Sequence, residues 1–269
     1  MGSESTVLIS QKNLQRFILA DTTIGVVRVA LTLGMLGYTS YSDIKTREVS
    51  DLVWIIFGGA GLVICVYEAL IGVLDIWIIS ISLGFMLAFA ALTGFLGLFG
   101  GADLLAFITL ALLTPYTPVN PPYGFKPIVF PLSLVTNAVV TSCILMVWVL
   151  FLNLVTGISW NGLNSEPLWK KLAVLISGRR VNVSKIRGPP YDYPLEILGP
   201  DGVRRLSISL GVMEDEPAWK IIQDLKTSGV EMVWMTKTIP FLVSLLVGFI
   251  ITLFAGDLML YAVDLIIRH

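Results

Sequence analysis

Asp43 and Asp103 are the acids whose positions suggest chemistry, because each lies at one end of a long apolar run. Asp43 closes the first run, and Asp103 opens a later one in Gly100-Gly101-Ala102-Asp103. If these runs cross a membrane, an ionisable side chain at their ends is costly and becomes a candidate functional residue. Two such acids that converge can share one proton, because like charges a few ångströms apart cannot both ionise.

Two acids that share a proton can hydrolyse a peptide bond without a metal, a cofactor or a histidine. The ionised acid takes a proton from water, the water attacks the scissile carbonyl, and the protonated acid donates to the carbonyl oxygen. The single histidine, His269, falls on the opposite side in the topology derived below. We therefore expect no cofactor, no metal site and no histidine-dependent hydrolysis.

The composition requires that the elements holding these acids be membrane helices. Of 269 residues, 55% are apolar and 14% are charged, and the mean hydropathy is +0.83. A soluble domain carries about a quarter charged residues. Apolar runs of this length exclude a cytosolic enzyme, a secreted disulfide scaffold and a disordered chain. Cys65 and Cys143 lie inside such runs and are interpreted as small buried hydrophobes.

Six apolar stretches predict an all-α polytopic membrane protein with six transmembrane helices. A continuous helix over 84–114 would be about 46 Å long, well beyond a hydrocarbon core of about 30 Å, so the chain must turn back. Gly100-Gly101 is where the backbone can bend. The fourth helix is then short, about 18 Å before it reaches Asp103. The predicted spans are 24–42, 52–71, 74–98, 104–114, 128–156 and 238–266.

The distribution of basic residues predicts which side carries the two acids. Lys45 and Arg47 follow the first span, whereas the next loop holds Glu68 and Asp75 and no base. The positive-inside rule then places both aspartates on the cytoplasmic side of the cell membrane, together with the basic segment before the last span. Three bases near the N-terminus argue against this orientation: Lys12, Arg16 and Arg28.

A polar segment between the fifth and sixth spans predicts a small α+β cytoplasmic domain. It holds 11 of the 18 Lys and Arg residues. Its local signals predict a helix from Pro167 to Gly178, a hairpin of 195–198 with 203–210, and a helix from Glu216 to Gly229. The predicted domains are residues 1–157 in the membrane, 158–237 in the cytoplasm, and 238–269 completing the membrane domain. Three basic pairs suggest either lipid contacts or substrate docking: Lys170-Lys171, Arg179-Arg180 and Arg204-Arg205.

Four short motifs, in this order, resemble the type IV prepilin peptidase family, and within it the archaeal preflagellin peptidases, which are GxGD intramembrane aspartyl proteases. The first begins at Asp43 and continues through Lys45 and Arg47, and the second ends at Asp103. The third is Phe130-Pro131-Leu132-Ser133, and the fourth runs from Lys237 through Pro240, Phe241 and Leu242. The resemblance covers six spans and the cytoplasmic insert.

The resemblance implies that Asp43 and Asp103 are the catalytic pair. It implies a membrane aspartyl endopeptidase that removes a short basic leader from precursors of preflagellin or another prepilin-like protein. The motif residues Gly100, Gly101, Ala102, Lys45, Arg47, Pro240, Phe241 and Leu242 would then bind substrate or support the acids. The partners expected are these precursors and membrane lipid, and no nucleic acid.

Two departures from the family pattern change what is expected. Ala102 stands where the family has a glycine before the second aspartate, which adds one methyl group beside Asp103. We interpret it as a tolerated variant, because alanine is the smallest alternative to glycine. The cysteine-rich zinc loop of the bifunctional bacterial enzymes is missing, so no methyltransferase activity is expected.

Several other interpretations stay open from the sequence. The two acids could be structural interfacial carboxylates, or the proton or cation relay of a transporter. A membrane scaffold would leave Asp103 unexplained. Pro240 could simply start the last span. Glu48 and Asp51 could attract a basic leader, although interfacial solvation is the favoured interpretation. Asp257 and Asp264 are interpreted as outer-interface residues.

Overall fold

The computed structural model describes residues 2–208, 214–237 and 241–268, with side chains described from Thr22 onward except that of Lys237. The chain divides into two compact units. The first, called here the membrane unit, consists of residues 1–95, 101–139 and 241–269. The second unit consists of residues 96–100 and 140–240. Each is described separately.

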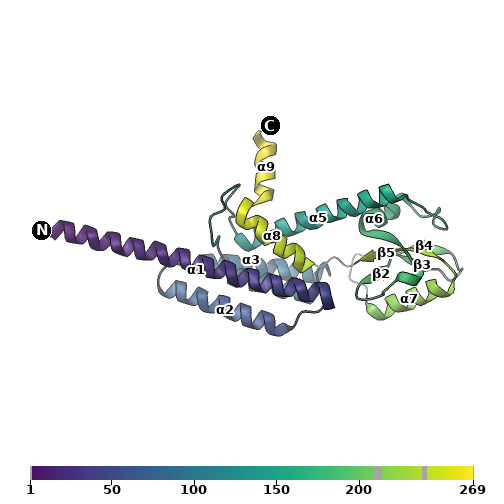
Figure 1. The fold of residues 1–269 in the computed structure, drawn as a ribbon, viewed down its shortest axis with the longest axis horizontal. Helices are drawn as coiled ribbons and strands as arrows, with labels where there is room; N and C mark the ends of the chain where they lie inside the picture. The colour runs from purple at the N-terminus through teal and green to yellow at the C-terminus, as the bar shows by residue number, and fades with distance from the viewer. Residues whose placement is uncertain (1, 209–213, 238–240, 269) are drawn as a thin grey trace. The chain divides into compact units, whose positions relative to one another are not determined.

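The regular secondary structure described in the membrane unit is helical, apart from one isolated bridge between Phe125 and Gly256 (Figure 1). Helix α4 packs against α2 and α3, and α8 packs against α1. The helices are α1 (Gly2–Thr46), α2 (Asp51–Leu70), α3 (Ile76–Phe95), α4 (Gly101–Leu113), the first part of α5 (Phe130–Thr156), α8 (Phe241–Ala255) and α9 (Leu258–Arg268).

The predicted count of six transmembrane helices is not confirmed. Among the described residues, four helices are long and apolar enough to cross a membrane: Thr22–Thr46, Asp51–Leu70, Ile76–Phe95 and Phe130–Thr156. Helices α4 and α8 are apolar but shorter, with 13 and 15 residues. The chain does turn back between α3 and α4, and the glycine with a positive φ in that turn is Gly97, at 64°.

A buried ion pair joins three elements of the membrane unit. Arg28 and Glu68 are both fully buried, with Nη2 of Arg28 2.6 Å from Oε2 of Glu68. Arg28 also donates to the carbonyl oxygens of Leu112 and Leu113 at the end of α4. Tyr116 donates its hydroxyl to Glu68. The charge of Arg28 is therefore neutralised inside the protein. Arg28 then no longer counts as a loop cation against the predicted orientation. The placement of Glu68 in a loop was wrong.

Helix α4 is held closely by glycines on its two neighbours. A Cβ atom on Gly61 of α2 would lie 2.9 Å from the carbonyl carbon of Leu112, and one on Gly94 of α3 would lie 2.9 Å from Leu104 Cδ1. Small residues at such contacts let membrane helices approach closely. Cys65 adds to this contact, since it is buried and its thiol donates to the carbonyl of Leu112. Cys143, in contrast, is exposed, so its interpretation as a buried residue was wrong.

The predicted last span is two helices rather than one. Helix α8 ends at Ala255 and α9 begins at Leu258, after a turn in which Gly256 has a φ of 69°. Asp257 is buried at this turn, accepts a hydrogen bond from Ser133 and caps the backbone N–H of Leu260. Asp257 therefore has a structural role, because its carboxylate stabilises the turn, and its place at the outer interface stays a prediction. Asp264 is partly exposed and pairs with Arg268.

The second unit contains the end of α5 and a small α/β domain with two antiparallel sheets. Its three-stranded sheet has the order β1-β5-β2, and β3 pairs with β4. The elements are α6 (Leu168–Ser177), β1 (Gly178–Asn182), the 3-10 turn η1 (Val183–Lys185), β2 (Asp192–Pro194), β3 (Glu196–Leu198), β4 (Arg204–Leu206), α7 (Asp215–Thr227) and β5 (Met232–Lys237).

Local signals predicted part of this domain. The structure confirms the helix that ends at Gly178 and the helix that begins near Glu216. Of the predicted hairpin it confirms the pairing of 196–198 with 204–206, and residues 209 and 210 lie outside the described residues. The central sheet was not predicted, because its strands are short and β1 contains two arginines. Packing creates it: Trp234 joins one buried apolar cluster, and Val233 and Met235 join another across the sheet.

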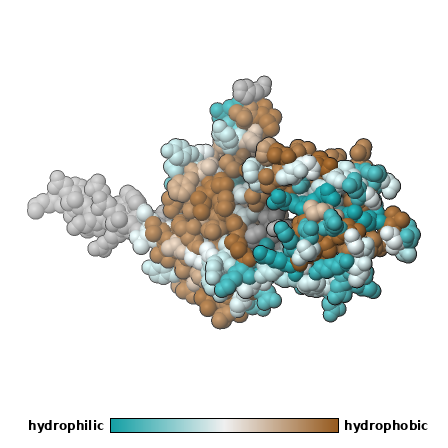
Figure 2. Space-filling model, turned by 45° about the vertical axis from the view of Figure 1, so that its right-hand side comes forward, coloured by the Kyte–Doolittle hydropathy of each residue, from teal (hydrophilic) through white to brown (hydrophobic). Residues whose placement is uncertain are grey.

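The two units differ in surface character (Figure 2). Brown, hydrophobic residues cover the helices of the membrane unit, whereas teal, hydrophilic residues predominate around the sheets. Exposed apolar side chains on the long helices include Ile55, Val63, Trp77 and Phe95. A water-facing surface of this kind would be costly, and lipid is the solvent that suits it. The chain is therefore a membrane protein.

Candidate active site

Asp43 lies in the last turn of α1, where the helix is about to end. Its side chain is 16% exposed, and Oδ1 lies 3.7 Å from Nη1 of Arg47. The carboxylate also accepts a hydrogen bond from the backbone N–H of Leu242. Asp43 is thus held by one neighbour from its own helix end and by one from the start of α8.

Asp103 lies in the first turn of α4 and is partly buried. An acid at this position is favoured by the partial positive charge of the helix N-terminus. Phe107, one turn further along, is fully buried and meets the ring of Phe241 edge-on at 6.2 Å. The helix that carries Asp103 is therefore in contact with the start of α8.

The start of α8 contacts both helices that carry the two acids. Leu242 donates to Asp43 through its N–H and accepts from the hydroxyl of Ser40 through its carbonyl, at 3.0 Å. Phe241 contacts Phe107 on α4. Two motifs predicted to act together, the one at Asp43 and the one at Phe241-Leu242, are thus brought together although about 200 residues separate them.

The Arg28 contact shows that both acids lie toward the same end of the membrane unit. At that contact α1 meets the end of α4. Asp43 is 15 residues further along α1, about 22 Å, and Asp103 is 10 residues back along α4, about 15 Å. The start of α8 contacts Asp43 through Leu242 and contacts Phe107 of α4 through Phe241. The path along α1 to Asp43 and the path back along α4 to Asp103 therefore run toward the same end.

Arg47 and Lys45 differ in whether their side chains contact Asp43. Arg47 ends α1 with a φ of 61°, the one positive φ among the non-glycine residues that the structure describes. Its N–H donates to the carbonyl of Asp43, and its guanidinium lies on the Asp43 carboxylate. Lys45 is exposed and lies over the ring of Tyr41, at 5.6 Å. Arg47 is therefore the cation that contacts the candidate acid.

The residues before Asp103 have ordinary backbone conformations. Ala102 is helical and partly buried, so a positive φ is not the reason for a small residue there. A Cβ atom on Gly101 would meet nothing within 4 Å. Gly100 precedes the helix and belongs to the other unit.

The remaining sequence predictions have mixed outcomes. Pro240 lies outside the described residues. Glu48 and Asp51 are exposed, which fits both interpretations given for them. Ser133 lies at the turn before α9 rather than at the aspartates. In the part of the chain with described side chains, no three His, Cys, Asp or Glu residues come together as metal ligands.

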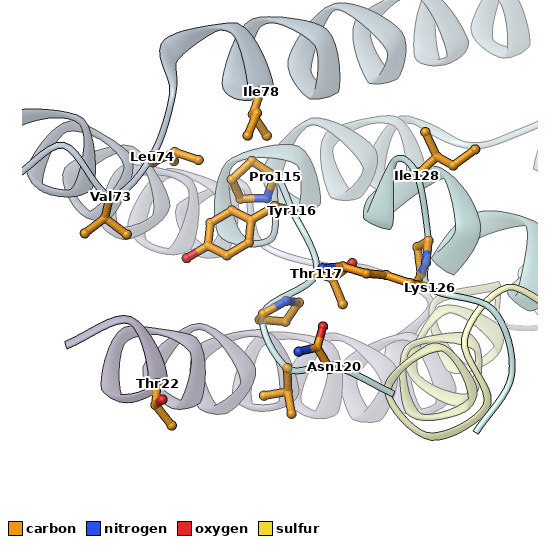
Figure 3. A pocket seen from close by; sticks show the side chains of 13 residues that line it. Thr22, Val73, Leu74, Ile78, Pro115, Tyr116, Thr117, Asn120, Lys126 and Ile128 are labelled. Carbon is orange, nitrogen blue, oxygen red and sulfur yellow. The ribbon is translucent and has the colours of Figure 1, made fainter. Parts of the chain in front are cut away.

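A cavity of about 690 Å³ lies beside the segments that follow α2 and α4 (Figure 3). Its lining includes Thr22 of α1, Val73 and Leu74 after α2, and Pro115 and Tyr116 after α4. Thr22 precedes Asp43 by 21 residues of the same helix, about 31 Å. This cavity is therefore not part of the candidate active site.

Ser40 and Phe107 contact the candidate site but were not predicted from the sequence. Both are buried, and both contact the start of α8. A serine and a phenylalanine inside an apolar run are common in membrane helices, so composition alone could not single them out. Their spacing from the acids, three and four residues, is the signal that places them on the acids' face of each helix.

Comparison with known proteins gives matches in two family profiles and in two relatives of similar length. The profile of the type IV leader peptidase family matches residues 30–160. A second profile, the archaeal peptidase A24 C-terminus type II, matches residues 170–258. The preflagellin peptidase of Methanococcus voltae is 27% identical over 246 residues, 85% of this chain and 96% of that protein. The preflagellin peptidase of Methanocaldococcus jannaschii is 26% identical over 244 residues, 84% of this chain and 92% of that protein.

These matches span both units and include both candidate acids. They lend no support to a transporter that uses Asp43 and Asp103 as a relay. Together with the fold and the placement of the motif residues, they show that the chain belongs to the type IV leader peptidase family.

Proposed function

We propose that this membrane peptidase removes the short basic leader from preflagellin or a similar type IV prepilin-like precursor. The relatives named preflagellin peptidases, which align over most of both chains, support this substrate class. We propose further that cleavage takes place at the cytoplasmic face of the cell membrane, where the leader of such a precursor lies. The basic residues that follow the first span support this orientation.

Asp43 and Asp103 are the proposed catalytic pair. The observation that carries this assignment is the start of α8, which contacts Asp43 directly and contacts the helix of Asp103 through Phe107. One acid, ionised, takes a proton from water as that water attacks the scissile carbonyl. The other, protonated, donates to the carbonyl oxygen. When the intermediate breaks down, the first acid gives the proton that it took from water to the leaving amine, and the second acid recovers a proton from a hydroxyl group of the intermediate.

The other parts of the site have supporting roles in this proposal. Arg47 orients the Asp43 carboxylate through the ion pair at 3.7 Å. The substrate near its cleavage site is extended and approaches the helix start at Gly101 and Ala102. Open space beside Gly101 supports an approach from this side. The polar domain, proposed as residues 158–237, faces the cytoplasm.

The experiment that tests the proposed function is cleavage of a precursor in membranes. Membranes from a host that lacks the enzyme and expresses this chain are incubated with a preflagellin that carries its basic leader. The expected result is a product shortened by the leader, with its new N-terminus identified by mass spectrometry. The matched control substrate has the lysines and arginines of its leader replaced by glutamine. No shortened product from the intact precursor would contradict the proposal.

A further inference from the structure

The three basic pairs of the second unit differ in whether their side chains form ion pairs and hydrogen bonds within the domain. Lys170 pairs with Glu166 and donates to the carbonyl of Leu206, and Lys171 donates to the carbonyl of Asn164. Arg204 pairs with Glu196, and Arg205 pairs with Asp201. Two of the pairs are therefore used to hold the domain together.

The third pair is not used in this way. Arg179 and Arg180 form no side-chain hydrogen bond or ion pair with a residue that the structure describes. Both line a cavity of about 220 Å³ together with Asn153, Thr156, Met232 and Trp234. The lining contains these two cations and no acid. Glu196 interacts electrostatically with Arg180, but its carboxylate already accepts hydrogen bonds from Arg204 and from the backbone N–H of Trp234.

Trp234 supplies a second, independent sign of a missing ligand. The residue is 2% exposed, and its indole N–H is buried without a hydrogen-bond partner in the described part of the chain. Its ring is fixed by stacking on Trp160 at 5.1 Å. Arg180 is its direct partner across the β1-β5 ladder, so the two side chains lie on the same face of the sheet. A buried donor left unpaired is costly, and an anion bound in this cavity would satisfy it.

The cavity lies where a membrane helix ends. The lining includes Asn153 and Thr156 in the last turn of α5 and Gly157 directly after it. The side-chain amide of Asn153 donates a hydrogen bond to the carbonyl of Gly178, the residue before Arg179. Just before the cavity, Leu154 and Val155 expose apolar side chains, 57% and 68%. Helix α6, which runs directly into β1, exposes Leu168, Trp169 and Leu172. Exposed apolar and Trp side chains of this kind are typical of the lipid interface.

We propose that Arg180 and the Trp234 indole, which lie on the same face of the sheet, form a binding site for the phosphate of an anionic membrane lipid, with Arg179 as a further cation that lines the same cavity. Arginine is suited to phosphate because its planar fork donates two parallel hydrogen bonds. A cavity of about 220 Å³ is smaller than a site for a drug-sized ligand and suits a headgroup. The acyl chains would lie along Leu154 and Val155 of α5.

Thermal unfolding of the full chain in mixed micelles tests this site without any use of peptidase activity. The protein in dodecylmaltoside is titrated with phosphatidylglycerol, with phosphatidylcholine or with inorganic phosphate, and the melting temperature is followed. A ligand that binds only the folded state raises it. The expected result is a saturable rise with phosphatidylglycerol and a much smaller one with the other two.

Variants decide whether the effect belongs to this cavity. Arg179→Gln with Arg180→Gln should need at least about tenfold more phosphatidylglycerol for half of the effect, since two charge-assisted hydrogen bonds are lost. Trp234→Phe, which removes the indole N–H together with one of the two rings, should need about two- to tenfold more. The control, Lys185→Gln with Lys220→Gln, removes the same charge from exposed positions outside the cavity and should match the parent. If the double arginine variant does not fold, Arg180→Lys replaces it, with an expected weakening of several-fold.

Three results would overturn the proposal. Equal stabilisation by phosphatidylcholine would show that no anionic headgroup is selected. Full stabilisation by inorganic phosphate would assign the site to a free anion instead of a lipid. An equal loss in the lysine control would mean that general surface charge attracts the lipid.

Discussion

Arg47 shows how a single residue serves both the helix end and the candidate acid. A left-handed conformation costs a residue with a side chain about 1 kcal/mol or more, so the structure around Arg47 must compensate. Its guanidinium lies on Asp43, which gives a reason for retaining arginine where glycine would fit better. Stability and activity should therefore respond in opposite directions to its replacement.

Arg47→Gly should leave the melting temperature unchanged or raise it, because glycine adopts this conformation without cost. The same variant should cleave more slowly than the parent through a lower kcat, because Asp43 loses the cation that orients it. Arg47→Lys, which keeps the charge, should retain more activity than Arg47→Gly. Paired measurements of unfolding and of cleavage rate check this, and an Arg47→Gly enzyme as fast as the parent would remove Arg47 from the site.

Ala102 is the position at which this sequence departs from its family. Because the residue is helical, alanine fits the backbone, and glycine would loosen the first turn of α4 by up to about 1 kcal/mol. Ala102→Gly should therefore cleave no faster than the parent. Ala102→Val adds bulk beside Asp103 and should slow cleavage markedly. Rates of the two variants decide the matter: a faster glycine variant would mean that alanine obstructs the substrate, and a fully active valine variant would mean that the position is not constrained.

At the scale of helices, the Arg28 and Glu68 pair determines how α4 is held. The guanidinium joins α1 to α2 through Glu68 and to α4 through two carbonyl oxygens. Those carbonyls lie in the last turn of α4, where no intrahelical donor is available to them. The ion pair therefore fixes the end of the short helix whose other end carries Asp103.

Glu68→Leu should destabilise the protein strongly, by about 3–5 kcal/mol, because it leaves the Arg28 cation buried without its partner. Arg28→Leu combined with Glu68→Leu should cost less than the sum of the two single replacements, since the groups are coupled. Melting temperatures in detergent test both statements. Asp75→Asn, an exposed acid in the turn after α2, is the control and should change little. An unaltered melting temperature in Glu68→Leu would show that the pair does not hold these helices.

The helices also show what a sequence can and cannot predict. Long apolar runs predicted α1, α2, α3 and α5, because lipid requires such runs. The break between α8 and α9 was not predictable, since its carboxylate and backbone groups are satisfied by Ser133 and Asn137 from another helix. The Arg28 and Glu68 pair joins residues 40 positions apart and has no local signal. Similarly, strands β1 and β5 depend on packing around Trp234.

The candidate site followed the same rule. Asp43, Asp103 and the Phe241-Leu242 segment were proposed from their motifs, and α8 contacts Asp43 and the helix of Asp103 in the structure. Ser40 and Phe107 were not found, because their roles depend on contacts between helices distant in sequence. The physical reason is general: an acid in an apolar run is conspicuous, whereas the residue that positions it can have any common type.

For the whole molecule, the proposed orientation places the two acids on the cytoplasmic side and the predicted 115–127 loop outside. A membrane-impermeant maleimide distinguishes the two faces. In a background with Cys65→Ser and Cys143→Ser, Lys126→Cys should be labelled in intact cells, and Glu48→Cys should be labelled only in inside-out vesicles. Both positions are exposed, so access depends on the side alone. Labelling of Glu48→Cys in intact cells would contradict the cytoplasmic site.

The central claim is that Asp43 and Asp103 act as one catalytic pair, and cleavage by their asparagine variants tests it most directly. An amide keeps the shape of the carboxyl group but cannot exchange its proton. Asp43→Asn, Asp103→Asn and the double variant should all lose cleavage to a similar extent, because residues that act as a unit are not additive. Asp75→Asn should cleave like the parent, and all four proteins should reach the membrane. Appreciable turnover of the precursor by either single variant would contradict the account.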